Sequence, residues 1–296
     1  MRLVDLLDLK DVGDDRYVAA PLDHSSGARV FGGQLLAQAL AAAGRTVPDE
    51  RRPHSLHGYF LHPGNPDEPL EFEVTTLREG RSQTVRQVVG RQQSLGRQGT
   101  TEVIALTAAF AGGGSASGPV LEHQLTTSPF TNFDDVEPLP DTLERTDGRL
   151  DDWFARRILP KPVELRFVDH PARDLVFRGE KPPRTQRILM RIKDRLPDSP
   201  VTHACGLAYF SDLFLLSSAL YPHQASVGDH GMLVASLDHT IWFHGPLRAD
   251  EWLLYVLDSD WAGQGRGLCQ GKLFDATGRL VATVLQEGLI KPIRKA

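Results

Sequence analysis

Cysteine is scarce in this chain, and long hydrophobic runs are absent. Two cysteines in 296 residues, Cys205 and Cys269, are typical of a reduced protein in which thiols pack as small apolar side chains. The longest apolar runs, such as residues 103–110, are too short to span a bilayer, and the region after Met1 does not resemble a signal peptide. We therefore expect a cytoplasmic protein with no membrane partner.

The chain also lacks an excess of positive charge. Its formal net charge is −5, so the composition predicts no nucleic-acid partner, while 41% hydrophobic and 24% charged residues are typical of a folded globular protein. No G-x-S-x-G motif is present, which argues against a serine mechanism of the α/β-hydrolase type. No cluster of three or four His and Cys ligands occurs, so we expect no metal and no organic cofactor.

What the chain does contain is a loose internal repeat. FGGQLLAQALAAAG from Phe31 and FSDLFLLSSALYP from Phe210 each predict an apolar helix, and each is followed by a strand candidate built around Ser-Leu, at Ser55 and Ser236. The spacing between the two phenylalanines nearly equals the spacing between the two serines. That equality favours duplication over coincidence.

Each half then continues in stretches that alternate apolar and polar residues. Val, Thr and aromatic residues at period two, with turn candidates such as QSLGRQG and DATGRL, predict antiparallel strands. The candidate strands cover residues 70–80, 82–92, 100–110, 163–169, 186–192, 251–261, 265–275 and 280–290.

A helix that is apolar on most of its circumference must be wrapped by other elements. We therefore predict an α+β fold, a double hotdog, in which two tandem repeats each wrap an antiparallel sheet around a long central helix and the sheets pair edge to edge. The N-terminal repeat should cover residues 1–115 and the C-terminal repeat residues 161–296. The stretch 116–160, which begins in AGGGSASGP and is rich in Pro, Asp and Thr, should be an irregular linker.

Within the second predicted helix, Asp212 is a single acid among apolar side chains. A helix beginning near Ser211 would place Asp212 on the same buried stripe as Leu215, Leu216 and Ala219. Ser211 and Asp212 could simply open the helix, because short polar residues and acids are favoured in a first turn. The first repeat has Gly32 or Gly33 at the corresponding position and so begins its helix without an acid, which favours a chemical role for Asp212 and one catalytic site per chain.

Six stretches in the same order resemble the acyl-CoA thioesterase II family of the TesB type: VFGGQLLAQAL, HSLHGYFLHPG, TTLREGRS, LAYFSDLFLL, SLDHTIWFH and VATVLQEGLI. The resemblance covers nearly the whole chain and is weakest between about residues 115 and 160. It implies hydrolysis of acyl-CoA thioesters, with the active site in the second repeat. It identifies Asp212, Ser236 and Gln286 as the catalytic residues, with Ser236 at a position where many relatives have Thr.

These residue types suit thioester hydrolysis. A positioned carboxylate can act as general base on a water, a role that contributes about 10²–10⁴-fold, while Ser236 and Gln286 hold the water and the carboxylate. Backbone N–H groups near a helix start could bind the oxyanion. Gly32 and Gly33 are candidates for this substrate contact, although the pair could equally serve only to let the chain turn tightly.

The other polar candidates have weaker support. His57 could support the site, while Asp238 and His239 are expected to serve the sheet or line the pocket. Arginine suits phosphate groups, so Arg81, Arg86 and Arg266 could contact CoA, although solvated surface arginines are more common.

We therefore expect an acyl-CoA thioesterase that releases a free fatty acid and CoA and that assembles as a homo-oligomer. Two alternatives are another hotdog enzyme, a hydratase or dehydratase of acyl thioesters, and a non-catalytic acyl-CoA binding module. Hydratases pair an acid with a nearby His, and in the sequence no His follows Asp212 until His223.

Overall fold

A computed structural model gives the structure of the chain. It describes residues 1–21, 27, 29–93, 99–112, 121–125, 132–227 and 232–292. Most of the predicted turn QSLGRQG and most of AGGGSASGP lie outside these residues, whereas DATGRL is a described turn. In that turn the Asp275 side chain accepts hydrogen bonds from the backbone N–H groups of Thr277 and Arg279, and Gly278 has a positive φ of 83°.

The first half contains the helices α1 (Leu3–Leu6) and α2 (Gly32–Gly44). Its strands are β1 (Lys10–Gly13), β2 (Arg16–Ala19), β3 (Arg52–Phe60), β4 (Leu70–Glu79), β5 (Gln83–Gln93) and β6 (Thr100–Ala111).

The remaining helical segments are η1 (Phe133–Asp135), α3 (Leu139–Glu144), α4 (Asp151–Arg157), α5 (Ala172–Phe177), α6 (Pro200–Ser211), η2 (Leu216–Ala219) and η3 (Tyr221–His223). The strands of the second half are β7 (Val163–Phe167), β8 (Gln186–Ile192), β9 (Met232–Ser236), β10 (Asp238–Phe243), β11 (Leu253–Gly263), β12 (Arg266–Phe274) and β13 (Leu280–Pro292).

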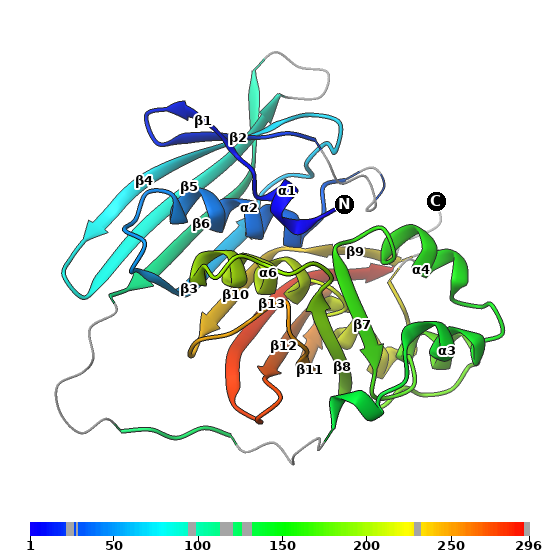
Figure 1. The fold of residues 1–296 in the computed structure, drawn as a ribbon. Helices are drawn as coiled ribbons and strands as arrows, with labels where there is room; N and C mark the ends of the chain where they lie inside the picture. Colours follow the sequence, from blue (N-terminus) through cyan, green and yellow to red (C-terminus); the bar gives the residue numbers. More distant parts are fainter. Residues whose placement is uncertain are drawn as a thin grey trace.

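The strands form one antiparallel sheet in the order β1-β2-β4-β5-β6-β3-β10-β13-β12-β11-β8-β7, with β9 paired to β13. Counted outward from the central pair, the first half runs β3-β6-β5-β4-β2-β1 and the second half runs β10-β13-β12-β11-β8-β7. The strands of the two halves therefore follow the same order. Figure 1 shows the blue-to-cyan half above the green-to-red half, with β3 beside β10 at the junction. The sheet is therefore two similar sheets joined edge to edge, as predicted for a double hotdog, and we propose 1–115 and 161–296 as the extents of the repeats.

The two central helices, α2 and α6, pack against each other between the halves (Figure 1). Nearly every residue of α2 is buried, and α6 is buried from His203 to Ser211. Small side chains allow this close packing, because Ala and Gly let two helix backbones approach. By length and composition the segment Pro200–His223 could cross a membrane, but most of it is buried in this fold, where α6 is a core helix.

Three sequence predictions need comment. The segment 116–160 is not simply irregular, because its described residues include η1, α3 and α4. Leu150, directly before α4, and Phe154, within it, are buried in the core. The helix predicted to begin near Ser211 is wrong, since α6 ends there. Cys205 and Cys269 are both buried and unpaired, in keeping with their predicted role as packing residues.

Candidate active site

Asp212 lies directly after the end of α6. The helix runs from Pro200 to Ser211 and is capped by Ser199, whose hydroxyl accepts a hydrogen bond from Thr202 N–H at 3.3 Å. Ser followed by Pro is a strong signal for a helix start, because the hydroxyl caps the helix and proline fits the first turn. That signal, in DSPVTHACGL, predicts the observed helix better than the apolar spacing after Ser211 does.

The Asp212 carboxylate caps the other central helix, α2. Its Oδ2 accepts a hydrogen bond from Gly33 N–H at 3.0 Å. Phe31 precedes α2 and provides no side-chain cap. Asp212 of the second repeat therefore provides the capping hydrogen bond that a Ser or Asp directly before the helix normally provides. The positive end of the α2 dipole also favours the anion. Helix capping by Asp212 is therefore real, but the helix belongs to the first repeat.

Gly32 and Gly33 are needed for this contact. A Cβ on Gly33 would lie 2.0 Å from the Tyr209 carbonyl oxygen, and one on Gly32 would lie 2.7 Å from Asp212 Oδ2. Both glycines thus let the start of α2 approach the end of α6. The prediction that they occupy the position of Asp212 in the repeat is wrong, because they begin one helix whereas Asp212 follows the other.

Gln286 joins Asp212 to Ser236. The Gln286 Nε2 group donates to Asp212 Oδ1 at 2.8 Å and to Ser236 Oγ at 2.6 Å. Gln286 lies on β13 and Ser236 ends β9, the strand paired to β13. The structure therefore brings together all three residues named by the resemblance. Gln286 is fully buried, while Asp212 and Ser236 line a cavity.

Burial dominates the electrostatics of Asp212. Its side chain is 8% exposed, and this desolvation raises the pKa of the carboxyl above its usual value. Hydrogen bonds from Gln286 and Gly33 and the positive charge of Lys161 act in the opposite direction. Lys161 is itself buried, with its Nζ 3.9 Å from the centre of the Phe31 ring. The carboxylate is thus held in a mostly apolar site with a few specific donors.

His239 also lies beside Asp212, a proximity that sequence reasoning missed. Its Nδ1 is 3.9 Å from Asp212 Oδ1, and its Nε2 is 2.9 Å from Ser211 Oγ. The side chain is fully buried, and burial lowers the pKa of His239 to about 3, so the ring is neutral near pH 7. Nδ1 has no hydrogen-bond partner among the described residues. In the sequence, the one indication of this proximity was that His239 follows the candidate Ser236 by three residues. Only the fold places the His239 ring against the end of α6.

Asp238, the residue before His239, serves the sheet. Its Oδ1 accepts a hydrogen bond from Glu287 N–H at 2.7 Å.

The structure does not bring His57 to the site. It is exposed on β3 and contacts Trp242 and Thr240 on β10. His57 does not line the cavity of Asp212, because Leu56 and His57 point to opposite faces of the strand and Leu56 faces the core. The structure therefore gives no support to the role predicted for His57.

The predicted phosphate contacts do not reach the site either. Arg86 is buried and donates to Glu79 Oε2 at 2.6 Å and to Thr46, while Arg266 pairs with Glu287 at 3.5 Å. None of Arg81, Arg86 and Arg266 lines the cavity of Asp212. Within the described part of the chain, no group of three or more His, Cys, Asp or Glu side chains could hold a metal ion.

The cavity beside Asp212 and Ser236 has a volume of about 750 Å³. Its apolar wall includes Phe31, Trp153, Leu213, Phe214 and Val234. Its basic wall, on and near α4, includes Arg149, Arg156, Arg157 and Lys161, together with the acid Asp152. Arg156 pairs with Asp152, and Arg149 pairs with Asp174. A carboxylate, a hydroxyl, an apolar wall and a cluster of cations therefore share one space.

The fold is that of a double-hotdog protein. Within the described residues, Asp212, Gln286 and Ser236 form one hydrogen-bonded cluster. Two family models match the chain, acyl-CoA thioesterase over residues 162–289 and acyl-CoA thioesterase N-terminal domain over residues 20–111. The chain belongs to the acyl-CoA thioesterase family.

Individual relatives agree over nearly the full length. The chain is 34% identical to acyl-CoA thioesterase 2 of Haemophilus influenzae, over 98% of this chain and 96% of that protein. It is 35% identical to acyl-coenzyme A thioesterase 8 of Homo sapiens, over 89% of this chain and 81% of that protein. The solved structure of acyl-CoA thioesterase II TesB2 from Mycobacterium marinum is 33% identical, with a TM-score of 0.74 over 99% of this chain and 98% of that one.

Proposed function

We propose that this chain hydrolyses acyl-CoA thioesters to the free acid and CoA, with Asp212 as the general base. The observation that carries the proposal is the Asp212–Gln286–Ser236 cluster, whose acid and hydroxyl face one cavity. Asp212 takes a proton from water while the water oxygen attacks the thioester carbonyl carbon. The C–S bond then breaks, and the CoA sulfur leaves as a thiolate that takes up the proton held by Asp212, which restores the carboxylate.

Gln286 and Ser236 orient the reacting groups. Because Gln286 donates one N–H to each partner, it fixes the direction of the carboxylate and the rotamer of the Ser236 hydroxyl. Ser236 accepts that bond and keeps its own proton for the attacking water. Gln286 acts as a positioning residue, since it does not line the cavity.

The oxyanion contact is proposed for the N–H of Gly32. The first N–H groups of a helix have no partner within the helix. At the start of α2, Gly33 N–H is used by Asp212, and Gln34 and Leu35 donate to the Phe31 carbonyl. Gly32 N–H is the remaining amide of the glycine pair, at the positive end of the α2 dipole. Gly32 does not itself line the cavity, but it lies between Phe31 and Asp212, which both do, and a Cβ on it would be 2.7 Å from Asp212 Oδ2.

The walls of the cavity suit the two parts of the substrate. Its apolar wall fits an acyl chain, and the arginines on and near α4 fit the phosphates of CoA, which arginine binds well. These arginines take the place of Arg81, Arg86 and Arg266 in the proposal.

One observation favours the dehydratase alternative: the acid Asp212 and the histidine His239 lie close together. The histidine is fully buried, however, and does not line the cavity, so in this arrangement it cannot reach a substrate. The thioesterase reading therefore has the better support.

The deciding experiment follows free thiol from a panel of acyl-CoA esters, with hydration of an enoyl-CoA measured in parallel. Thiol release supports the proposal. Hydration without thiol release would favour the dehydratase, and binding without either reaction would favour the non-catalytic module. A cytoplasmic location, a homo-oligomer and the absence of cofactor, membrane or nucleic-acid partners remain predictions from the sequence.

A further inference from the structure

Phe214 has an unusual backbone conformation for its side chain. Its φ is 65°, in the left-handed region that is costly for residues with a Cβ. It lies two residues after Asp212, where the chain leaves α6 for η2. Leu213 N–H donates to Phe210 at 2.9 Å and Ser217 N–H donates to Phe214 at 3.0 Å, and these two bonds hold the bend. Glycine would form this bend at lower cost, so the aromatic ring itself needs an explanation.

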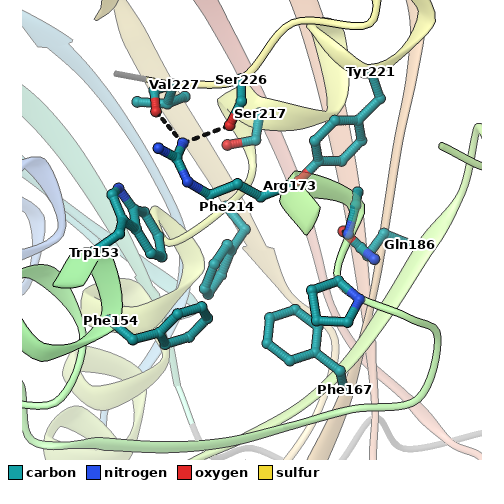
Figure 2. A pocket seen from close by; sticks show the side chains of 12 residues that line it. Trp153, Phe154, Phe167, Arg173, Gln186, Phe214, Ser217, Tyr221, Ser226 and Val227 are labelled. Carbon is teal, nitrogen blue, oxygen red and sulfur yellow. Dashed lines mark hydrogen bonds between the residues drawn. The ribbon is translucent and has the colours of Figure 1, made fainter. Parts of the chain in front are cut away.

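The ring of Phe214 lies within an aromatic cluster. Its centre is 5.9 Å from that of Trp153 and 5.8 Å from that of Phe167. Phe154 contacts both of those rings, at 5.0 Å and 5.9 Å. Figure 2 shows the Phe214 ring between the Trp153 and Phe154 rings on one side and the Phe167 ring on the other.

Two cavities meet at Phe214. One is the large cavity of Asp212 and Ser236, and the other is a small cavity whose lining includes Phe154 and Phe167 (Figure 2). The small cavity has a volume of about 20 Å³, roughly the space of one water molecule. Five residues line both cavities: Phe214, Trp153, Arg173, Ser217 and Val227. Phe154 and Phe167 line only the small one.

Polar groups at the small cavity bond to the protein. The Gln186 amide donates to the His170 carbonyl at 3.0 Å and accepts from Ala172 N–H at 3.4 Å. The Tyr221 hydroxyl is hydrogen-bonded to Ser217. The Arg173 guanidinium, which also lines this cavity, donates to Ser226 Oγ and to the Val227 carbonyl oxygen (Figure 2). With these polar groups engaged, the rings of Phe154, Phe167 and Phe214 are the main apolar surface that the space behind Phe214 offers a ligand.

We propose that the Phe214 ring is the end wall of the acyl compartment and sets the longest acyl chain that the site accepts. This inference rests on the proposed thioesterase function. An aliphatic acyl chain lies along the apolar wall with its carbonyl at Asp212 and its methyl end against Phe214. Removal of the ring joins the two cavities, so longer chains fit.

The test measures kcat/KM for straight-chain saturated acyl-CoA esters from short to long. Phe214→Ala should shift the preferred ester to a longer chain. Each additional buried methylene gains roughly fourfold in binding, so the ratio of long-chain to short-chain kcat/KM should rise by about tenfold or more. Phe214→Gly should give the same shift and also relieves the backbone conformation, which keeps the test available if the alanine variant folds poorly.

Phe154→Ala is the matched control. It removes a ring of the same kind from the small cavity but leaves Phe214 in place, so its chain-length profile should match that of the wild type. A wild-type profile in both Phe214 variants, or a shift caused by Phe154→Ala alone, would overturn the inference. A wild-type protein that releases no thiol from any ester would instead refute the proposed function, which separates the two failures.

Discussion

The two ends of the central helix pair are built alike but carry opposite charges. Asp212 directly follows α6, and Arg45 directly follows α2, each in the same backbone region. Asp212 accepts a hydrogen bond from the start of the neighbouring helix. Arg45 instead donates to the carbonyls of Leu7 and Leu9 in the N-terminal segment. Equivalent positions have thus become a buried carboxylate in one repeat and a structural cation in the other.

The helix starts differ in a related way. Ser199 caps α6 locally, whereas α2 begins without a local cap and receives one from Asp212. The end at which α6 begins also has a cavity, of about 530 Å³, lined by Arg52, His203 and Arg248 among others. Asp198, the acid on that cavity, is paired with Arg248. The cap supplied across the repeat boundary therefore places a buried acid at one end of the helix pair, whereas the acid at the other end, Asp198, is exposed and paired with Arg248.

The largest expected effect is the loss of the acid at the active end. Asp212→Asn removes the proposed base while keeping the shape of the side chain, so kcat should fall by at least about 10²-fold. Arg45→Gln, the matching change at the opposite end, should leave kcat near that of the wild type. Thiol release and circular dichroism of both variants measure activity and folding. Near-wild-type turnover in folded Asp212→Asn would refute the role of the acid.

Loss of the positioning residue should have the next largest effect. Gln286→Leu removes the donor to both Asp212 and Ser236, and a hydrogen bond to a charged group contributes roughly 10–100-fold, so kcat should fall by about that factor. KM should change little because Gln286 does not line the cavity. Gln38→Leu is the control, since Gln38 is equally buried but donates to the Leu6 carbonyl in the first repeat. Equal losses of kcat in Gln286→Leu and Gln38→Leu would show that the loss of a buried amide, and not the loss of positioning, explains the effect.

Much of this architecture was predictable because strands leave a simple pattern. Period-two alternation and turn residues predicted β4–β6, β7, β8 and β11–β13 within a few residues. The end of α6 was not predictable in the same way. Apolar residues continue on both sides of Asp212, so the helical periodicity of the sequence continues past the point where α6 ends. The chain nevertheless bends at Phe214, whose left-handed backbone has no signal in a pattern of apolar residues.

The site shows a similar limit. Gln286 and Ser236 resemble ordinary strand residues, and the family resemblance, not their spacing, singled them out. The contact of Asp212 with Gly33 depends on the packing of α2 against α6, which no local pattern contains. His239 was missed for the same reason, because its neighbour is close only in three dimensions.

A smaller effect is expected from the glycines at the two ends. Ala is favoured over Gly within a helix by about 1 kcal/mol. A Cβ at residue 33 would meet the backbone oxygen of Tyr209 at 2.0 Å, but one at Gly44 would meet the flexible Val201 side chain at 2.6 Å. Gly33→Ala should lower the free energy of unfolding by about 2 kcal/mol or more and reduce activity, while Gly44→Ala should stay within about 1 kcal/mol of the wild type. Urea denaturation measures the free energy of unfolding of both variants. Equal destabilisation by Gly33→Ala and Gly44→Ala would contradict the proposed difference between the two ends of α2.

The smallest effect concerns the pH profile, which separates the acid from its neighbouring histidine. Burial raises the pKa of Asp212, and the carboxylate is the active form, so kcat/KM should fall as pH is lowered through a value above the ordinary aspartate pKa of about 3.9. Burial holds the pKa of His239 near 3, so this ring stays neutral through that fall. His239→Asn should therefore keep the acid limb and change kcat by no more than several-fold. If the limb disappears in His239→Asn while the protein stays folded, the titrating group is the histidine, and the active end of the helix pair works by an acid–histidine pair instead of a lone carboxylate.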